Sequence, residues 1–395
     1  MSQGEIRFDN LEIAFKSKSD KDLNFSAFIF KLMSNKLITN SLILLTKVAL
    51  FLRLPISFLI KKTIFKQFCG GESISESIKI AKHLGDSNIG SILDYSIEGE
   101  SNDAHFEHTM EELLRVVEIA KTNPNIPVTC VKITGIGRFS TLERINSQKC
   151  SDKIKKDFGK IETRLDIICK ACHSSDIPIY IDAEESWIQD SIDELCEKMM
   201  MKYNSNKAIV FNTLQMYRWD RIEYLSNLIQ KAENNSFKLG LKIVRGAYLE
   251  KENIRAKELG YLSPMQPNKT ATDSDYDKAL LKIIQNIHLI ELCAGTHNEK
   301  STKYLTKLMK EYNIPNNHPN IYFSQLYGMS DHMSYNLSNA GYNVSKYLPY
   351  GPIKSTIPYL IRRAQENTAI AGQLGKELKF ILLEKKRRKR LKKQR

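Results

Sequence analysis

The segment PIYIDAEESWIQDSIDELCEKMMMKYNSNKAIVFNTLQMY, residues 178–217, contains the repeating unit that decides the fold. Its two ends, 178–185 and 208–217, are short runs of apolar and β-branched residues, which are typical of strands. The stretch between them, SIDELCEKMMMKYN, has the apolar spacing expected of an amphipathic helix. A strand, a helix and a second strand in this order predict a parallel βαβ unit.

The same alternation extends along most of the chain. Helical patterns separate six further strand-like runs, at 91–99, 128–136, 238–248, 290–297, 321–329 and 343–351. Eight alternations over about 290 residues favour a single (β/α)8 barrel over a doubly wound sheet. We therefore predict an α/β chain with three segments: an N-terminal helical arm at 1–85, a TIM-type barrel at 86–375 and a basic C-terminal tail at 376–395.

Most of the formal net charge of +14 comes from the C-terminus, because EKKRRKRLKKQR at 384–395 holds nine Lys or Arg among its last eleven residues. The rest of the chain is only mildly basic, so its overall charge says little about partners of the folded core. The tail also lacks the aromatic residues that stack on bases. We expect no nucleic-acid partner.

Two N-terminal segments bear on location. The first ten residues, MSQGEIRFDN, lack the basic and apolar regions of a secretory signal, so we expect a cytoplasmic protein. The most apolar run, 41–62, contains Lys47, Arg53 and Pro55, which argues against a membrane-spanning helix. This run is expected to form a pair of helices that are either packed on the protein or lie on a membrane surface.

The seven cysteines are scattered and odd in number, which does not suggest a disulfide framework. CKACH at 169–173 has the spacing of a c-type haem attachment site, but that attachment requires an exported chain. We therefore favour a pair of free thiols near a helix end. TGIGRF at 134–139 lacks the third glycine of a dinucleotide-binding fingerprint, and the chain has no P-loop.

Polar residues recur where the predicted strands end. In a (β/α)8 barrel the carboxyl ends of all strands meet at one rim, and chemistry belongs there. We therefore expect the following side chains to face one site: Lys132, Asp182 with Glu184 and Glu185, Gln215 with Tyr217, Arg245, the run Thr296, His297 and Asn298, and Tyr347.

The helix after the last strand, IPYLIRRAQEN at 357–367, carries adjacent arginines. Tyr359, Arg362, Arg363 and Glu366 share one helical face, while apolar residues occupy the other. One interpretation is a solvated face with an ion pair between Arg362 and Glu366. The other is a clamp for a carboxylate, because guanidinium groups bind carboxylates in a bidentate way.

Seven ordered motifs resemble the proline dehydrogenase, or proline oxidase, family. They are FCGGE at 68–72, VKITG at 131–135, IDAEE at 181–185, LKIVRGAYLEKE at 241–252, GTHN at 295–298, QLYGM at 325–329 and YLPYGP…PYLIRRAQEN at 347–367. The resemblance spans about residues 60 to 372 and fits the monofunctional type. It implies a distorted barrel that uses FAD to oxidise L-proline to 1-pyrroline-5-carboxylate, the first step of proline catabolism, and passes electrons to a membrane quinone.

The resemblance also implies a substrate site. Arg362 and Arg363 would bind the carboxylate of proline with Lys132 as the third cation, and Asp182 would orient these cations. The remaining positions would enclose the ring; they are Leu326, Tyr347 and Tyr359 as walls, with Ala247 and Tyr248 nearby.

A second set of positions corresponds to FAD contacts in the family. Gln215 and Lys242 would lie at the isoalloxazine edge, and Val244, Arg245 and Gly246 near the ribityl and pyrophosphate groups. The rest of the cofactor would contact Thr272, Thr296, His297, Asn298 and Glu366. No residue is assigned as a general base, because the neutral amine is expected to be the reactive form of proline, and no metal ligands are expected.

Alternatives remain for the substrate and for the tail. Hydroxyproline could be oxidised on the same scaffold, although Tyr347 would crowd a ring hydroxyl. A metal-dependent hydrolase using Asp182, Glu184 and His297 is disfavoured, because only one histidine closes a strand. The tail could hold the protein at the inner face of the membrane as a peripheral protein, or it could be a disordered solubilising segment.

Overall fold

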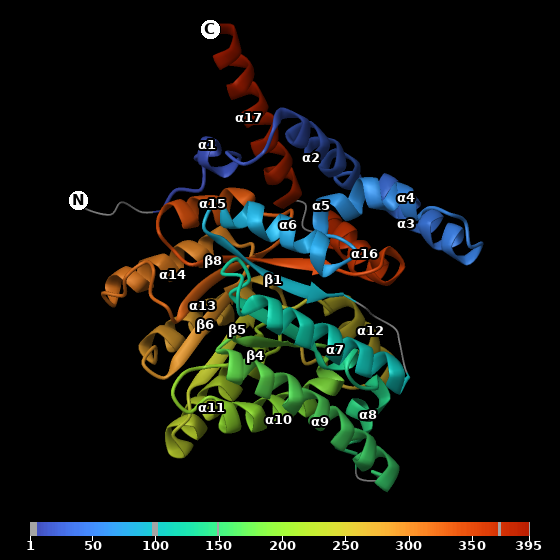
Figure 1. Ribbon diagram of the computed structural model, residues 1–395, viewed down its shortest axis with the longest axis vertical. Helices are drawn as coiled ribbons and strands as arrows, with labels where there is room; N and C mark the ends of the chain where they lie inside the picture. The colour runs from blue at the N-terminus through green and yellow to red at the C-terminus, as the bar shows by residue number, and fades with distance from the viewer. Residues whose placement is uncertain (1–5, 97–101, 148–149, 370–372, 395) are drawn as a thin grey trace.

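The computed structural model describes residues 6–96, 102–147, 150–369 and 373–394, and their side chains except those of 366–369 and 373–374. Eight parallel strands form a closed barrel in sequence order (Figure 1). They are β1 (Ile89–Tyr95), β2 (Val128–Lys132), β3 (Ile179–Asp182), β4 (Val210–Gln215), β5 (Leu239–Val244), β6 (Ile290–Gly295), β7 (Ile321–Leu326) and β8 (Val344–Tyr350). The predicted (β/α)8 barrel is confirmed.

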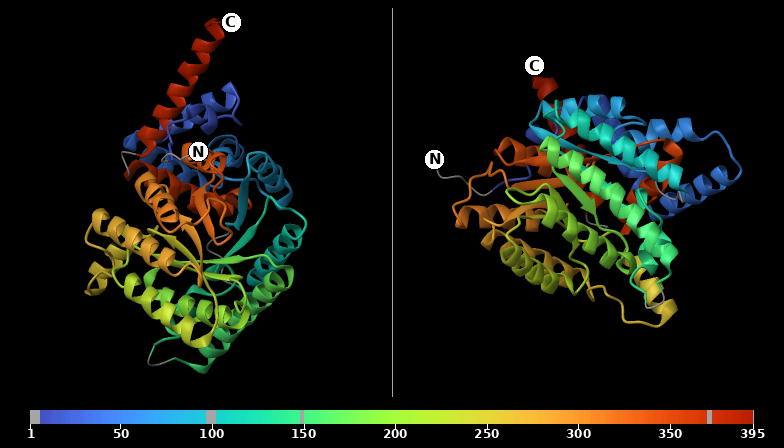
Figure 2. Two further views of the ribbon diagram at one scale, coloured as in Figure 1. Left: turned by 90° about the vertical axis from the view of Figure 1, so that its left-hand side faces the viewer. Right: turned by 60° about the horizontal axis from the view of Figure 1, so that its bottom comes forward.

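Helices follow each strand and form an outer layer around most of the barrel (Figures 1 and 2). In order they are α7 (Asp103–Ala120), α9 (Asp152–Ser175), α10 (Ser186–Tyr203), α11 (Arg221–Asn235), α13 (Lys269–Gln285), α14 (Glu299–Glu311), α15 (Asp331–Asn339) and α16 (Ile353–Ala369). Two loops carry additional helices, with η2 (Ile133–Gly135) and α8 (Phe139–Arg144) after β2, and α12 (Leu249–Leu259) after β5.

The barrel departs from the regular pattern at its eighth helix. Helix α16 packs on an N-terminal arm, whereas α6 of that arm covers β1 and β8, where the last helix of a regular barrel would pack. The arm contains α1 (Leu11–Ala14), α2 (Asp20–Met33), α3 (Lys36–Phe51), α4 (Ser57–Ile60), η1 (Lys61–Phe65), α5 (Lys66–Phe68) and α6 (Ile74–Gly85). The arm thus completes the barrel wall and frees α16 to lie beyond the end of β8.

The C-terminal residues form a helix, α17 (Gln373–Gln394), which packs on α1 and α2. Glu384 of this helix is fully buried and pairs within the helix with Arg387 and Arg388, each at 2.7 Å. Arg388 and Lys392 also pair with Asp20 of α2. The alternative of a disordered tail is therefore wrong for residues 373–394, because part of its charge is used to dock it.

The apolar run at 41–62 covers the end of α3, a short turn, α4 and the start of η1. Among the described helices, none is by itself long and apolar enough to cross a membrane. Helices α2 and α3 reach that threshold only when taken together, and a bend of 92° separates them. This agrees with the prediction that the run does not form a spanning helix.

The cysteines of CKACH lie inside α9. Cys169 and Cys172 are fully buried free thiols, and burial raises the pKa of Cys172 to about 12. Haem attachment requires both sulfur atoms to face a common ligand-sized space, whereas these side chains belong to the core between α9 and the barrel. The interpretation as free thiols is confirmed.

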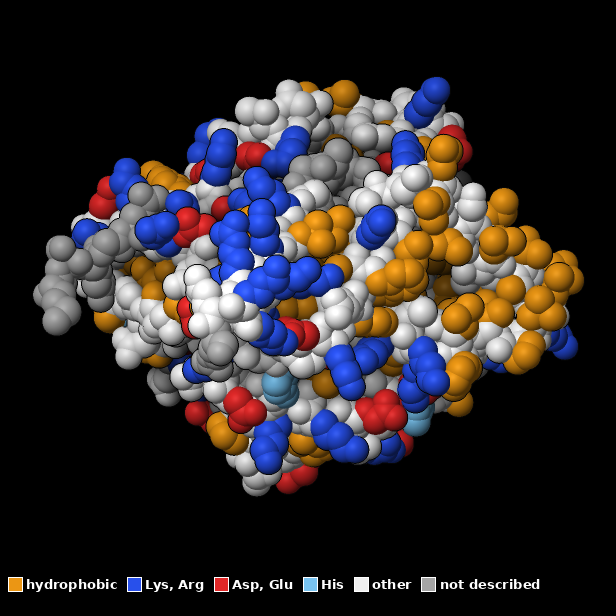
Figure 3. All heavy atoms as spheres, turned by 90° about the horizontal axis from the view of Figure 1, so that it is seen from above, with side chains coloured by type: hydrophobic (Ala, Val, Ile, Leu, Met, Phe, Trp, Pro, Cys, Tyr) orange, Lys and Arg blue, Asp and Glu red, His pale blue; other side chains and the backbone are white. Residues whose placement is uncertain are grey.

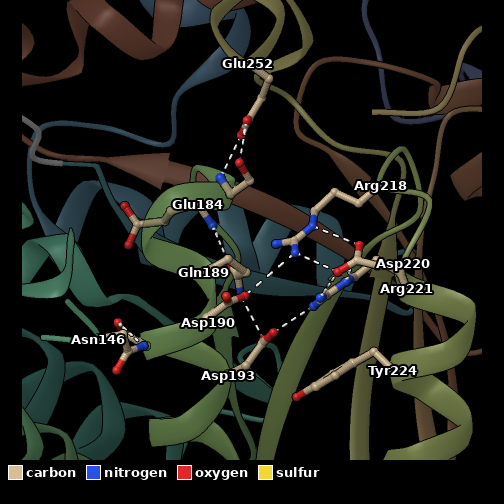
Figure 4. Close-up of polar contacts among 12 residues, drawn as sticks. Asn146, Glu184, Gln189, Asp190, Asp193, Arg218, Asp220, Arg221, Tyr224 and Glu252 are labelled. Atoms are coloured by element: carbon tan, nitrogen blue, oxygen red, sulfur yellow. Dashed lines mark hydrogen bonds and ion pairs between the residues drawn. The ribbon is translucent and has the colours of Figure 1, made fainter. Parts of the chain in front are cut away.

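A buried polar network fixes the helices behind β3 and β4 (Figure 4). Asp193 of α10 accepts hydrogen bonds from Gln189 and Asn212, each at 2.9 Å, and pairs with Arg221 of α11 at 2.7 Å. Gln189 in turn accepts the backbone N–H of Glu184 at 2.8 Å. The network therefore connects the outer helices to the loop that follows β3.

Replacement of Asp193 tests this network. Asp193→Ala leaves Arg221 buried without one of its carboxylate partners, and we expect the free energy of unfolding to fall by roughly 3 kcal/mol. Urea denaturation measures this value. The matched control is Asp190→Ala, which removes a partner of Arg218 that is 75% exposed and 3.7 Å away, and should cost less than about 0.5 kcal/mol. Equal losses in both variants would contradict the role of Asp193.

Candidate active site at the carboxyl end of the barrel

Four charges from four strands, all buried or half-buried, meet inside the barrel mouth. Lys132, the last residue of β2, pairs with Asp94 of β1 at 2.6 Å and lies 3.9 Å from Asp182 of β3. Lys242 of β5 forms a close ion pair with Asp182. The order Asp94, Lys132, Asp182, Lys242 alternates in sign, so each charge lies beside an opposite one, which offsets the cost of burial.

Tyr347 of β8 completes this cluster. Its hydroxyl lies 2.6 Å from Lys242 Nζ and 2.8 Å from Asp182 Oδ1, to which it donates. Burial alone would raise the pKa of Asp182, but Lys242 and Lys132 together with these hydrogen bonds hold it below its ordinary value. Asp182 is therefore an ionised carboxylate that fixes the ring of Tyr347. The sequence predicted Lys132 and Arg363 as its neighbours, whereas its closest partners are Lys242 and Tyr347.

Asp94 is a member of the site that the sequence analysis missed. It neutralises Lys132, which was expected to act as the third cation for a substrate. Burial opposes the charge on Lys132, yet Asp94 and Asp182 raise the pKa of Lys132 well above its usual range. An available signal was Asp94 itself, an acid near the end of the apolar run SILDY, because an acid at the end of a barrel strand faces the same rim as the other polar residues.

The two arginines lie on α16. Arg363 is buried, and its guanidinium carbon lies 5.2 Å from the ring centroid of Tyr359, whereas Arg362 is half-buried. On the opposite face, Leu360 and Ala364 pack in an apolar cluster with residues of the arm. The predicted division into an apolar back and an arginine face is therefore present. The side chain of Glu366 is outside the described residues, so the ion pair with Arg362 stays a prediction.

Leu326 connects the two halves of the site. It lies at the end of β7 and packs both against the cluster that contains Tyr347 and against the cluster that contains Tyr359. Of the other residues predicted to lie near the substrate, Ala247 is exposed and Tyr248 is half-buried where α12 begins. Leu326 thus links the apolar wall residues, whereas Ala247 and Tyr248 lie on the loop that follows β5.

A second cluster surrounds Arg245, directly after β5. Its guanidinium donates to Asp273 at 2.6 Å and to the hydroxyls of Thr296 and Ser301, each at 2.8 Å, and it stacks 4.3 Å from the ring centroid of Tyr276. These bonds use three of the five guanidinium N–H donors. The sequence predicted Arg245 and Thr296 but not Asp273 or Ser301, because both acceptors come from neighbouring helices.

The other residues predicted to contact a cofactor have structural partners. Thr272 donates to the backbone of Asn268 in its own helix at 3.4 Å, and Asn298 accepts backbone N–H groups as the N-cap of α14. His297 lies 2.8 Å from the hydroxyl of Ser330, and the N–H of Leu326 donates to its Nε2 at 3.4 Å. Burial, followed by Lys346 and Arg363, lowers the pKa of His297 to about 3, so this ring is neutral near pH 7.

The end of β4 and the loop after β5 form a surface with unsatisfied polar groups. Gln215 Oε1 and the hydroxyl of Tyr217 are buried and have no hydrogen-bond partner within the described part of the chain. Gly246 has a φ of +128°, and a Cβ there would lie 2.5 Å from the ring of Tyr217. Buried polar atoms are normally paired, so these residues, together with the remaining donors of Arg245, fit a polar cofactor. Val244, the last residue of β5, is half-buried.

The hydrolase alternative is not supported by these partners. Asp182 is paired with Lys242, Glu184 accepts hydrogen bonds from Thr134, and His297 faces Ser330. The group that could hold a metal among the described residues is Asp94, Cys130 and Asp182, with ligand atoms within 4.8 Å of one another. Both of its carboxylates are already engaged by lysines.

This geometry agrees with comparisons to known proteins. A model of the proline dehydrogenase family matches residues 77–376. The chain belongs to the proline dehydrogenase family. It is thus an oxidoreductase of the proline dehydrogenase type, and the resemblance of the seven motifs is confirmed.

Individual relatives cover nearly the whole chain. "Proline dehydrogenase 1, mitochondrial" of Dictyostelium discoideum is 34% identical over 95% of this chain and 74% of its own length. "Hydroxyproline dehydrogenase" of Xenopus laevis is 28% identical over 98% of this chain and 91% of its own length. The crystal structure of proline utilization A (PutA) from Bdellovibrio bacteriovorus superposes with a TM-score of 0.71 at 20% identity, over 93% of this chain and 39% of that chain. The last comparison supports the fold alone.

Glu184, next to the site, gives a prediction about pH. Its burial, opposed by hydrogen bonds from Thr134, raises its pKa to about 7. A carboxyl whose pKa is higher in the folded state stabilises the fold below its unfolded pKa, and this contribution is lost as the pH rises toward 7. In Glu184→Gln, the decline in the free energy of unfolding between about pH 4.5 and 7 should shrink by up to roughly 3 kcal/mol. Urea denaturation at several pH values measures it, and an unchanged slope would contradict the raised pKa.

Proposed function

We propose that the protein oxidises L-proline to 1-pyrroline-5-carboxylate, with FAD as the electron acceptor. The observation that carries this proposal is the pair of arginines on α16, of which Arg363 lies over the ring of Tyr359. Leu326, at the end of β7, packs both against the cluster of Tyr359 and against the cluster of Tyr347. An arginine pair beside an apolar pocket suits a small amino acid with a carboxylate at one end and a hydrocarbon ring at the other.

The charge balance of the site supports the binding of a carboxylate by the two arginines. Asp94 and Asp182 offset Lys132 and Lys242, so this cluster carries no net charge. Arg362 and Arg363 then supply the positive charge that holds the carboxylate, each such charge-assisted bond contributing roughly 1.5–3 kcal/mol. Lys132 orients the carboxylate from within its ion pair, and Asp182 keeps Tyr347 in place against the ring.

The residues of the chain position the substrate, and the cofactor supplies the chemistry. FAD, when bound, accepts a hydride from the ring carbon next to the proline nitrogen. That C–H bond breaks as the C=N bond forms, and the nitrogen releases a proton. His297 is neutral near pH 7 and bonded to Ser330, so we assign it no role as a base; the neutral amine of proline is the reactive form.

The proposed cofactor contacts are the residues that the family resemblance implies. Gln215 and Lys242 would contact the isoalloxazine, and Arg245 with Gly246 and Val244 the ribityl and pyrophosphate groups. Thr272, Thr296, His297, Asn298 and Glu366 complete the proposed set. The buried Oε1 of Gln215 is the observation that favours such a contact.

We further propose that electrons pass to a membrane quinone and that the protein works in the cytoplasm at the inner face of the membrane. The support is chemical: reduced FAD needs an acceptor, and the exposed cations of α17 would attract anionic lipids.

The test is the visible spectrum of the purified protein during anaerobic addition of L-proline or hydroxyproline. We expect a yellow protein that bleaches rapidly with proline and at least about tenfold more slowly with hydroxyproline, a difference of roughly 1.4 kcal/mol, because the fixed ring of Tyr347 crowds a ring hydroxyl. Faster bleaching by hydroxyproline would favour the activity named for the Xenopus relative. A colourless protein that cannot be reconstituted with FAD would refute the proposal.

Asp182→Ala separates substrate binding from cofactor binding. Loss of this carboxylate frees Tyr347 and leaves Lys132 and Lys242 with one acid between them, so the KM for proline should rise at least about tenfold. The amount of FAD bound per chain should stay within about twofold of the unmodified protein, because the Arg245 cluster is intact. Steady-state kinetics and the flavin absorbance measure the two values. Equal loss of both would contradict the role of Asp182.

A further inference from the structure

The N-terminal arm exposes a large apolar face. In α3 the side chains at spacings i, i+7, i+11 and i+14 point to solvent; they are Leu37, Leu44, Val48 and Phe51, with Leu37 80% and Phe51 86% exposed. Phe58 and Leu59 of α4 continue this surface. Figure 3 shows apolar side chains gathered over this side of the molecule. We call these six residues the arm face.

The opposite side of α3 is packed. Thr39 is buried, and Ile43 and Leu50 are half-buried among residues of α2 and α16. The exposure of the arm face is therefore not caused by a helix that has separated from the protein. Monomeric soluble proteins rarely expose a continuous patch of large apolar side chains unless the patch binds something.

The charges around the arm face indicate what it binds. No Asp or Glu occurs between Asp22 and Glu72, a stretch that carries seven Lys or Arg. Lys47 and Arg53 lie exposed beside the apolar residues, and Lys62 lies 4.1 Å from the ring centroid of Phe58. An apolar surface with only positive charges at its rim matches an anionic lipid bilayer, where acyl chains and phosphate headgroups lie next to each other.

A second copy of the chain is a poorer occupant for this face. In a symmetric dimer the same patch contacts itself, so the cations at its rim would approach one another without any acidic residue from this stretch to balance them. The length of α3 also excludes spanning, since 16 residues extend about 24 Å and a hydrocarbon core is about 30 Å thick.

We propose that the arm face inserts into the acyl chains at the surface of an anionic membrane and is the principal membrane-binding element of this protein. The inference rests on the peripheral membrane association proposed above and assigns it to α3 and α4, with the exposed cations of α17 as an auxiliary contact. Figure 3 views the molecule from the end at which α17 lies, and shows Lys and Arg side chains next to the apolar side chains.

The test is co-sedimentation of the full chain with vesicles of phosphatidylcholine alone or mixed with phosphatidylglycerol. For the double variant Leu44→Glu with Phe51→Glu, we expect the lipid concentration at half-binding to rise at least about tenfold. The matched control Leu262→Glu changes an apolar residue that is 84% exposed outside the arm face, and should shift it less than about twofold. Unmodified protein bound to the mixed vesicles should largely resist moderate salt, because apolar insertion is not screened.

A tail variant separates this inference from the proposed function. It replaces Lys386, Lys389, Arg390 and Lys393, which are exposed, with Gln. It leaves in place Arg388 and Lys392, which pair with Asp20 of α2. Loss of binding in the tail variant, with the arm variant binding normally, would overturn the inference while membrane association stands. Failure of the unmodified protein to bind either vesicle would overturn both proposals. Bleaching by proline in the arm variant shows that its active site is intact. If the unmodified protein is a dimer, and the arm variant dissociates without any change in vesicle binding, the arm face is instead an interface between copies.

Discussion

The pairing of opposite charges at the carboxyl end of the barrel is the interaction on which the site depends. Lys132 and Asp182 are direct neighbours across β2 and β3, and the barrel brings Asp94 and Lys242 beside them. An unpaired charge in this position would cost several kcal/mol, and a complete set of partners removes most of that cost. The rigid cluster then fixes Tyr347, which would otherwise rotate about its side chain.

The N-terminal arm covers the place where β1 pairs with β8 and closes the barrel. Since α16 lies beyond the strand ends, another element must cover the outside of β1 and β8, and α6 does so. Lys346 of β8 is fully buried and pairs with Asp331 of α15 at 2.9 Å, and Lys18 from the arm pairs with the same carboxylate at 2.6 Å. Asp331 thus joins the last strand to the first residues of the chain, and the pKa of Asp331 lies well below its usual range because both lysines outweigh the effect of burial.

The fold and the rim residues could be predicted because each strand carries a local signal that does not depend on its partners. Periodicity located all eight strands, and the barrel topology alone placed Lys132, Asp182 and Gln215 at one end. The partners could not be predicted in the same way. Asp273 and Ser301 approach Arg245 from two different helices, and Asp94 approaches Lys132 from the adjacent strand, so each contact depends on helix rotation and strand register. The docking of α17 was missed because it depends on ion pairs of Arg388 and Lys392 with Asp20, a residue far away in the sequence, and a highly basic segment gives no local sign of such a partner.

The position of α16 relates the substrate site to the outer surface of the arm. One face of α16 carries Arg362 and Arg363, and its apolar back, with Leu360 and Ala364, belongs to the cluster that α16 shares with the arm, including α3. The inner side of α3 meets this back, while the outer side is the arm face. Two helices therefore separate the proposed lipid surface from the arginines. A substitution that loosens the contact between α3 and α16 would therefore disturb both the arginine pair and the arm face, because the same helix pair supports them.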